Sequence, residues 1–183
     1  MRPRSIILLL IAMLVITPIV ALTGSATKLV WTPGWDDKTQ PLDYAHSFVK
    51  FNQSGNGTLQ VTYHLQGAKP NTAHTVGVHI FRCVLSFGQF MASPCGYFLR
   101  DGNWSYASPV ELGTVTTDQS GSGDLQVSVS GIAPGTYSIE FHTRISTMSL
   151  TNIAVCGASP NPCSVVYQSP GPFGAGVVEI TIP

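Results

Sequence analysis

The segment NQSGNGTLQV, from Asn52 to Val61, recurs as DQSGSGDLQV from Asp118 to Val127, with seven of ten positions identical. In both copies a Gly- and Ser-rich stretch leads into alternating apolar and polar residues, the pattern of a turn followed by a half-buried β-strand. The similarity continues as GAKPNT from Gly67 against GIAPGT from Gly131, and then as HTVGVH against YSIEFH. The sequence therefore predicts a duplicated unit of three strands.

The alternation also predicts which strand faces are buried. His79 and His142 end the two aligned stretches, and both fall on the outward face, as does Glu140. We therefore expect surface histidines at these positions. The expected core-facing positions are Leu59, Val61, Tyr63, Leu65, Val76, Val78 and Ile80 in the first unit, and Leu125, Val127, Val129, Tyr137, Ile139 and Phe141 in the second.

Further short strands are expected around residues 45–51, 110–116, 164–168 and 177–182, and no segment beyond the N-terminus has a helical period. About eight to ten short strands with this pattern predict an all-β fold, an antiparallel Greek-key β-sandwich, because two packed sheets bury the apolar faces of both units. The chain has 183 residues, of which 44% are hydrophobic, so it can form one such domain.

The N-terminus has the features of an export signal. Two arginines precede an apolar stretch from Ile6 to Leu22, and the small residues Gly24–Ala26 follow it. We expect a signal peptide over residues 1–26 and a single secreted or extracellular domain over residues 27–183. The apolar stretch is long for a signal peptide, so an uncleaved membrane anchor at the N-terminus is the alternative.

Charge limits the partners. Nine Lys and Arg balance nine Asp and Glu, and removal of Arg2 and Arg4 with the signal leaves a net charge of about −2. The basic residues are scattered singly along the chain, whereas nucleic-acid binding needs a clustered cationic surface. We therefore exclude nucleic acid and expect an extracellular protein or glycan as partner, with a membrane contacted only through an uncleaved N-terminal segment.

Four cysteines in an exported chain predict two disulfides. Of the three possible pairings we favour Cys83 with Cys95 and Cys156 with Cys163, because each pair brackets a short segment with the Gly, Pro and Ser of irregular loops. The other pairings stay open. A metal-thiolate cluster is disfavoured, since it would require closer, CxxC-like spacing.

The stretch SGIAPGTYSIEFH, from Ser130 to His142, resembles the part of copper-zinc superoxide dismutases where a Gly-Leu-x-x-Gly loop leads into a His-x-His strand. Chordin-type (CHRD) extracellular domains are similar there, and the resemblance implies a β-sandwich. At the position of the first copper-motif His this chain has Glu140 in one unit and Gly77 in the other, and only His142 and His79 match the second. The copper ligand set is not retained, so no cofactor is expected; His79, His142 and Glu140 remain the candidates for another metal site.

No catalytic arrangement stands out, because the sequence has no GxSxG elbow, no Cys beside a His and no convincing carboxylate pair. The insertion from Arg82 to Pro109 interrupts the repeat and is rich in aromatic residues. Trp104 beside Asp101 and Asn103 has the composition of a sugar-stacking platform, and the alternative is that the aromatic rings of the insertion close one end of the sandwich. The expected ligand-binding residues are Trp104, Tyr97, Tyr106, Asp101 and Asn103.

These features favour a non-catalytic secreted or cell-surface β-sandwich protein for binding or structural interaction. One alternative is a divergent metal-dependent, dismutase-like oxidoreductase. Another is a filament or matrix subunit in which residues 27–44 add a strand to a neighbour's sheet. For that segment, pairing as a first strand within its own domain is the simpler expectation.

Overall fold

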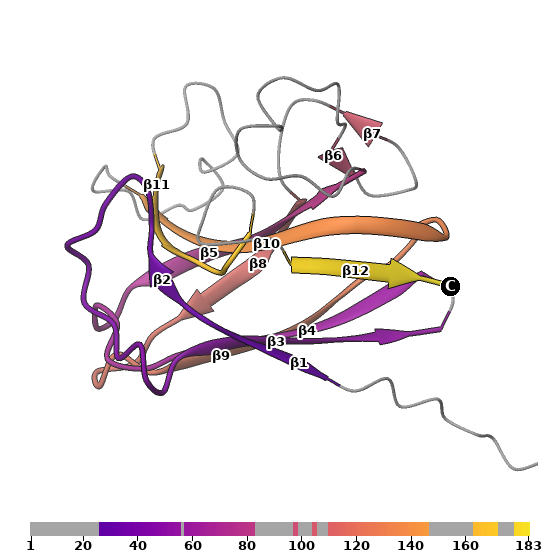
Figure 1. Cartoon of the computed structure of the whole chain (residues 1–183). Helices are drawn as coiled ribbons and strands as arrows, with labels where there is room; N and C mark the ends of the chain where they lie inside the picture. Colours follow the sequence, from indigo (N-terminus) through magenta and orange to yellow (C-terminus); the bar gives the residue numbers. More distant parts are fainter. Residues whose placement is uncertain are drawn as a thin grey trace, which may run out of the picture.

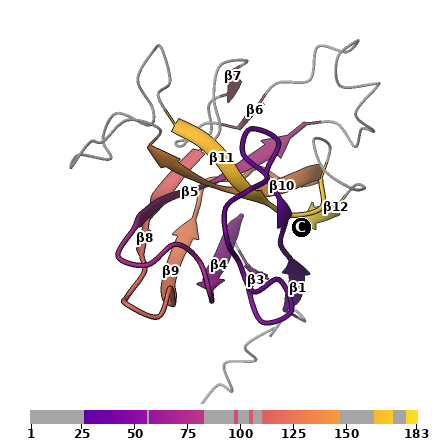
Figure 2. The same cartoon turned by 90° about the vertical axis from the view of Figure 1, so that its left-hand side faces the viewer.

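A computed structural model describes residues 26–55, 57–82, 97–98, 104–105, 110–146, 163–171 and 178–183. Within these ranges the chain is all-β and forms a β-sandwich of two antiparallel sheets, one of four strands and one of eight. Figures 1 and 2 show the two sheets as stacked layers. The predicted all-β sandwich is therefore confirmed.

The four-stranded sheet, called the small sheet, has the order β1 (Thr27–Val30), β3 (Phe48–Ser54), β4 (Thr58–Leu65), β9 (Gly123–Val129). The larger sheet runs β2 (Thr32–Pro33), β11 (Cys163–Gln168), β10 (Gly135–Ser146), β5 (Ala73–Phe81), β6 (Tyr97–Phe98), β7 (Trp104–Ser105). Two more strands complete it: β8 (Val110–Thr116) pairs with β5, and β12 (Val178–Ile182) pairs with β10.

The core lies between the sheets and consists of the predicted apolar faces. Phe141 of β10 contacts Phe51 and Tyr63 of the small sheet, with ring centroids 5.4 and 5.9 Å apart. The buried Tyr63 hydroxyl donates a hydrogen bond to the Gly77 carbonyl at 2.8 Å, so its polar end is satisfied. Of the predicted core positions, only Leu125 and Val127 are half-buried and not buried, because they lie on β9 at the edge of the small sheet.

The pairing of β4 with β9 follows the sequence repeat. Val61 lies opposite Val127, its own counterpart in the alignment. On either side the partners are exchanged between the units, with Leu59 opposite Val129 and Tyr63 opposite Leu125. The register is thus that of a local two-fold axis passing between the two strands.

The same relation holds in the larger sheet, where Val78 of β5 lies opposite its counterpart Phe141 of β10. The first strands of the two units differ, since β3 forms a hairpin with β4 in the small sheet whereas β8 pairs with β5 in the larger one. The correspondence therefore covers the second and third strands. Duplication of the unit and a Greek-key strand order stay predictions.

The N-terminal strand pairs within its own domain, because β1 lies against β3 with Lys28 opposite Lys50. This is the simpler of the two arrangements considered for that segment. The predicted signal peptide lies outside the described residues, apart from Ala26. The described residues form no helix that is long and apolar enough to cross a membrane.

Candidate functional site: a buried polar cluster on the larger sheet

The face of the larger sheet that points away from the core carries a group of buried polar side chains. Glu140 and His142 are fully buried, and His79 and Arg144 are 5% and 8% exposed. Together with Glu111 of β8 they are called the outer cluster here. The predicted outward direction of His79, His142 and Glu140 is right, but the expectation of surface histidines is wrong. Alternation along a strand predicts which face a side chain occupies and says nothing about whether that face is covered.

The two histidines lie side by side on neighbouring strands. In the β5–β10 register Glu140 is opposite His79, and His142 is opposite Gly77. Gly77 and Glu140 occupy equivalent positions in the two aligned units. The ring centroids of His79 and His142 are 4.8 Å apart. Gly77 makes this approach possible, because a β-carbon there would lie 2.7 Å from both Cε1 and Nε2 of His142.

Trp35 forms the exposed rim of the outer cluster. Its ring centroid lies 6.4 Å from that of His79 and 6.5 Å from that of His142, and the residue is 39% exposed. Its neighbours are bound to β11: Gly34 N donates to the Val166 carbonyl at 2.8 Å. No local sequence pattern predicts this contact, since the segment around Trp35 is far from both histidines along the chain. Two aspartates, Asp36 and Asp37, follow Trp35 directly in the sequence.

Those aspartates fix the segment that carries Trp35. Asp36 accepts a hydrogen bond through Oδ2 from the backbone N–H of Val165 at 2.8 Å. Asp37 accepts through Oδ1 from the backbone N–H and the hydroxyl of Thr39, at 2.9 and 2.6 Å. These hydrogen bonds lower the pKa of Asp37, so its carboxylate is charged at neutral pH.

Arg144 and Glu111 form the ion pair of the outer cluster. Arg144 Nη1 donates to Glu111 Oε1 at 2.8 Å, across the intervening strand β5. Burial raises the pKa of Glu111, and the positive charge of Arg144 acts against this rise. Burial likewise lowers the pKa of Arg144, while Glu111 and then Asp36 act in the opposite direction. Each charge therefore depends on its partner to remain ionised.

Both histidines of the outer cluster are neutral at physiological pH. Burial, with a further contribution from the charge of Arg144, lowers the pKa of His79 to about 3. Burial lowers the pKa of His142 well below its usual value, with smaller contributions from His79 and Arg144. A neutral imidazole carries one N–H donor and one lone pair. Among the described residues, neither ring nitrogen of His142 has a hydrogen-bond partner, and the same is true of Arg144 Nε and Gln168 Oε1.

The candidate metal ligands named from the sequence are thus neighbours, but they do not converge. Among the described residues there is no group of three or more His, Cys, Asp or Glu side chains placed to hold a metal ion. Glu140 instead packs against the backbone of Gly171, where a β-carbon would lie 2.5 Å from Glu140 Oε2.

The site predicted on the insertion is only partly described. Tyr97 and Trp104 begin β6 and β7, whose backbones form a short hairpin, and Tyr97 lies opposite Phe81 of β5. The hairpin therefore extends the larger sheet. Asp101, Asn103 and Tyr106 lie outside the described residues, as do Cys83, Cys95 and Cys156, whereas Cys163 begins β11. The ligand site on the insertion and both disulfides stay predictions.

No family model matches the sequence, and no curated protein matches it significantly. The resemblance to copper-zinc superoxide dismutases and chordin-type domains therefore rests on the stretch from Ser130 to His142 and its counterpart in the first unit.

Proposed function

We propose that this chain is a non-catalytic extracellular binding protein whose ligand site is the outer cluster. The observation that carries the proposal is His142. It is fully buried on the sheet face away from the core, and both of its ring nitrogens lack a hydrogen-bond partner in the part of the chain that the structure describes. Such a group costs about 1 to 3 kcal/mol of stability when nothing binds it. A site kept for packing alone would favour an apolar side chain there.

The groups around His142 suit a small polar ligand with one apolar face. His142 offers a donor and an acceptor, Arg144 Nε offers a donor, and Gln168 Oε1 offers an acceptor. Trp35 adds a partly exposed aromatic ring beside the histidines. Buried polar groups beside an aromatic ring are a feature of sugar sites, so a mono- or disaccharide is the ligand class that we propose.

The electrostatics of the outer cluster support binding over acid–base catalysis. A general base works best when its pKa is near the working pH. The pKa of His79 is lowered to about 3 and that of His142 is lowered well below its usual value, so both are weak bases. Arg144 and Glu111 are already paired with each other. The extracellular location rests on the predicted export signal at residues 1–26 and on the predicted disulfides.

Thermal unfolding in the presence of a panel of mono- and disaccharides tests this function. A sugar that binds only the folded state should raise the melting temperature of the wild-type protein, by mass action. The same sugar should leave the melting temperature of His142→Phe unchanged. Without sugar, that variant should melt at or above the wild-type temperature because an unpaired buried polar group is gone. Lys38→Gln, a change at an exposed loop residue, is the matched control. Absence of any shift across the panel, or an equal shift in His142→Phe, would contradict the proposal.

The pair of neutral histidines favours one second candidate, a divergent metal-dependent oxidoreductase. Their ring centroids are 4.8 Å apart, and neutral imidazoles are good ligands for zinc and copper. Elemental analysis after equilibration with either metal decides between the candidates. A stoichiometric metal ion that is lost in His79→Ala/His142→Ala would favour the oxidoreductase, and metal-free protein would exclude it.

A further inference from the structure

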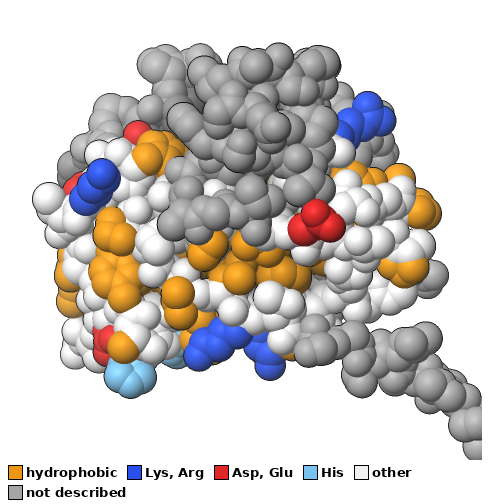
Figure 3. Space-filling model, in the orientation of Figure 1, with side chains coloured by type: hydrophobic (Ala, Val, Ile, Leu, Met, Phe, Trp, Pro, Cys, Tyr) orange, Lys and Arg blue, Asp and Glu red, His pale blue; other side chains and the backbone are white. Residues whose placement is uncertain are grey.

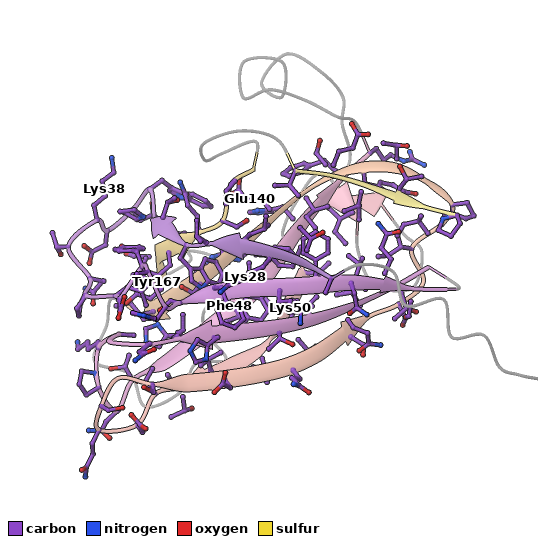
Figure 4. All side chains as sticks on the ribbon, turned by 60° about the horizontal axis from the view of Figure 1, so that its bottom comes forward. Lys28, Lys38, Phe48, Lys50, Glu140 and Tyr167 are labelled. Atoms are coloured by element: carbon purple, nitrogen blue, oxygen red, sulfur yellow. The ribbon has the colours of Figure 1, made fainter. Side chains whose placement is uncertain are left out.

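The outer face of the small sheet carries a second, separate feature. Lys28 of β1 lies directly opposite Lys50 of β3, and both side chains are exposed. Like charges at directly opposed positions destabilise a sheet. Figure 4 shows Lys28, Lys50 and Phe48 close together on the face that is brought forward. Figure 3 shows blue side chains gathered at the lower edge of the molecule, over this sheet.

No carboxylate neutralises the two lysines within the described ranges. Lys28 Nζ lies 4.2 Å from the centroid of the Phe48 ring, a cation–π contact that leaves its charge in place. The acidic residue on the same sheet face, Asp124 of β9, contacts His64 at 2.7 Å. The ion pairs of the described residues include no lysine. Two adjacent ammonium groups are therefore available to an anion.

Uncharged polar side chains continue from the lysines across the sheet. Lys50 lies opposite Thr62 of β4, and Thr62 lies opposite Gln126 of β9. With strands about 4.8 Å apart, this row spans roughly 15 Å from Lys28 to Gln126. A second row runs beside it, with Asn52, Gln60 and Ser128. Such a face offers positive charge at one end and hydrogen-bonding amides and hydroxyls along its length.

We propose that this face binds an acidic polysaccharide that lies across the strands. Its carboxylate or sulfate groups would contact Lys28 and Lys50, and its hydroxyl groups would bond to the side chains of Thr62 and Gln126. Carboxylated and sulfated polysaccharides share the required chemistry, namely repeated anionic groups on a hydroxyl-rich chain. The inference uses the extracellular location from the proposed function, but it does not depend on the outer cluster.

Binding of the full chain to immobilised polygalacturonate and heparin, with neutral dextran as reference, tests the proposal. The wild-type protein should bind at least one acidic polymer at low ionic strength and lose that binding in high salt. Lys28→Gln/Lys50→Gln should weaken it about tenfold, which corresponds to about 1.4 kcal/mol of binding free energy, because both positive charges that face the polymer are removed. Its melting temperature should change little, because the loss of the cation–π contact with Phe48 offsets the removal of the like-charge contact.

The matched control is Lys38→Gln/Lys69→Gln, which removes the same charge from exposed loop positions. It should retain wild-type affinity, and an equal loss in both double variants would overturn the proposal by showing a response to net charge alone. Binding to dextran as tight as to the acidic polymers, or no binding to either acidic polymer, would also overturn it. His142→Phe should bind the polymers normally, so failure here and failure of the proposed sugar site can be told apart.

Discussion

The imidazole of His142 lies over Gly77, the residue opposite it on the neighbouring strand, with Cε1 and Nε2 both 2.7 Å from where a β-carbon would be. In the aligned unit the position of Gly77 is held by Glu140, which lies opposite His79. The local two-fold relation therefore places the two histidines together, and the Gly–Glu difference makes their surroundings unequal. His142 lies over a glycine, which has no side chain, whereas His79 lies opposite the carboxylate-bearing Glu140.

Gly77→Ala should displace the His142 ring and destabilise the domain by about 1 to 3 kcal/mol, because the added methyl group has no free space. Urea unfolding measures the change. Gly55→Ala is the control, since a β-carbon there meets nothing within 4 Å, and it should have little effect. If the contact with His142 is the cause, Gly77→Ala should cost much less in a His142→Ala background.

The core positions of the repeat should respond according to their burial. Leu59→Ala removes a fully buried side chain and should cost about 2 to 5 kcal/mol. Leu125→Ala, at the aligned but half-buried position on the edge strand, should cost clearly less. The Gln60 side chain points to solvent, so Gln60→Ala should lower the free energy of unfolding by less than about 0.5 kcal/mol. Similar values for Leu59 and Leu125, from equilibrium denaturation, would contradict the difference in burial.

His79 and His142 show which features of the site could be predicted from the sequence and which could not. Alternation and the repeat predicted the strands, most of the core and the outward direction of both side chains. The contact between the rings depends on the register of β5 against β10, which is set by pairing between residues far apart in the chain. Trp35 joins them only because Gly34 and Asp36 bind β11, another long-range contact with no local signal.

His74 should make the domain sensitive to acid. It is fully buried, stacks on Tyr167 with ring centroids 5.8 Å apart, and has no hydrogen-bond partner at either ring nitrogen within the described ranges. Burial, with a smaller effect of Lys69, lowers its pKa from 6.5 to about 4. The unfolded chain therefore binds a proton between these pH values while the folded chain does not, so stability falls as the pH drops from 6.5 to 4.

The expected loss from His74 alone is about 3 kcal/mol over that interval. His74→Phe should flatten the dependence of unfolding free energy on pH, although His79 and His142 will retain part of it because their pKa values are lowered too. His46→Gln provides the comparison, since the His46 side chain is 68% exposed. A wild-type pH profile in His74→Phe would show that this residue does not control the acid response.

The sequence predicts two disulfides, and each of them closes a short loop. Peptide mapping under non-reducing conditions should give one crosslink between Cys83 and Cys95 and another between Cys156 and Cys163. Each should stabilise the domain by about 2 to 3 kcal/mol. Four free thiols, or a crosslink between Cys83 and Cys156, would contradict the predicted pairing.

Trp35 belongs to the ligand site proposed at the outer cluster, and Trp104 belongs to the site predicted on the insertion. The chain has three tryptophans, and the third, Trp31, is 2% exposed, so a ligand that binds at the surface should perturb the fluorescence of Trp35 or of Trp104. The probe is any sugar that raises the wild-type melting temperature. Trp35 lies beside the ring of His142, whose nitrogens have no hydrogen-bond partner among the described residues. We therefore expect Trp35→Phe to abolish the ligand-induced fluorescence change and Trp104→Phe to preserve it. The reverse result would move the ligand site to the insertion and leave the outer cluster without this role.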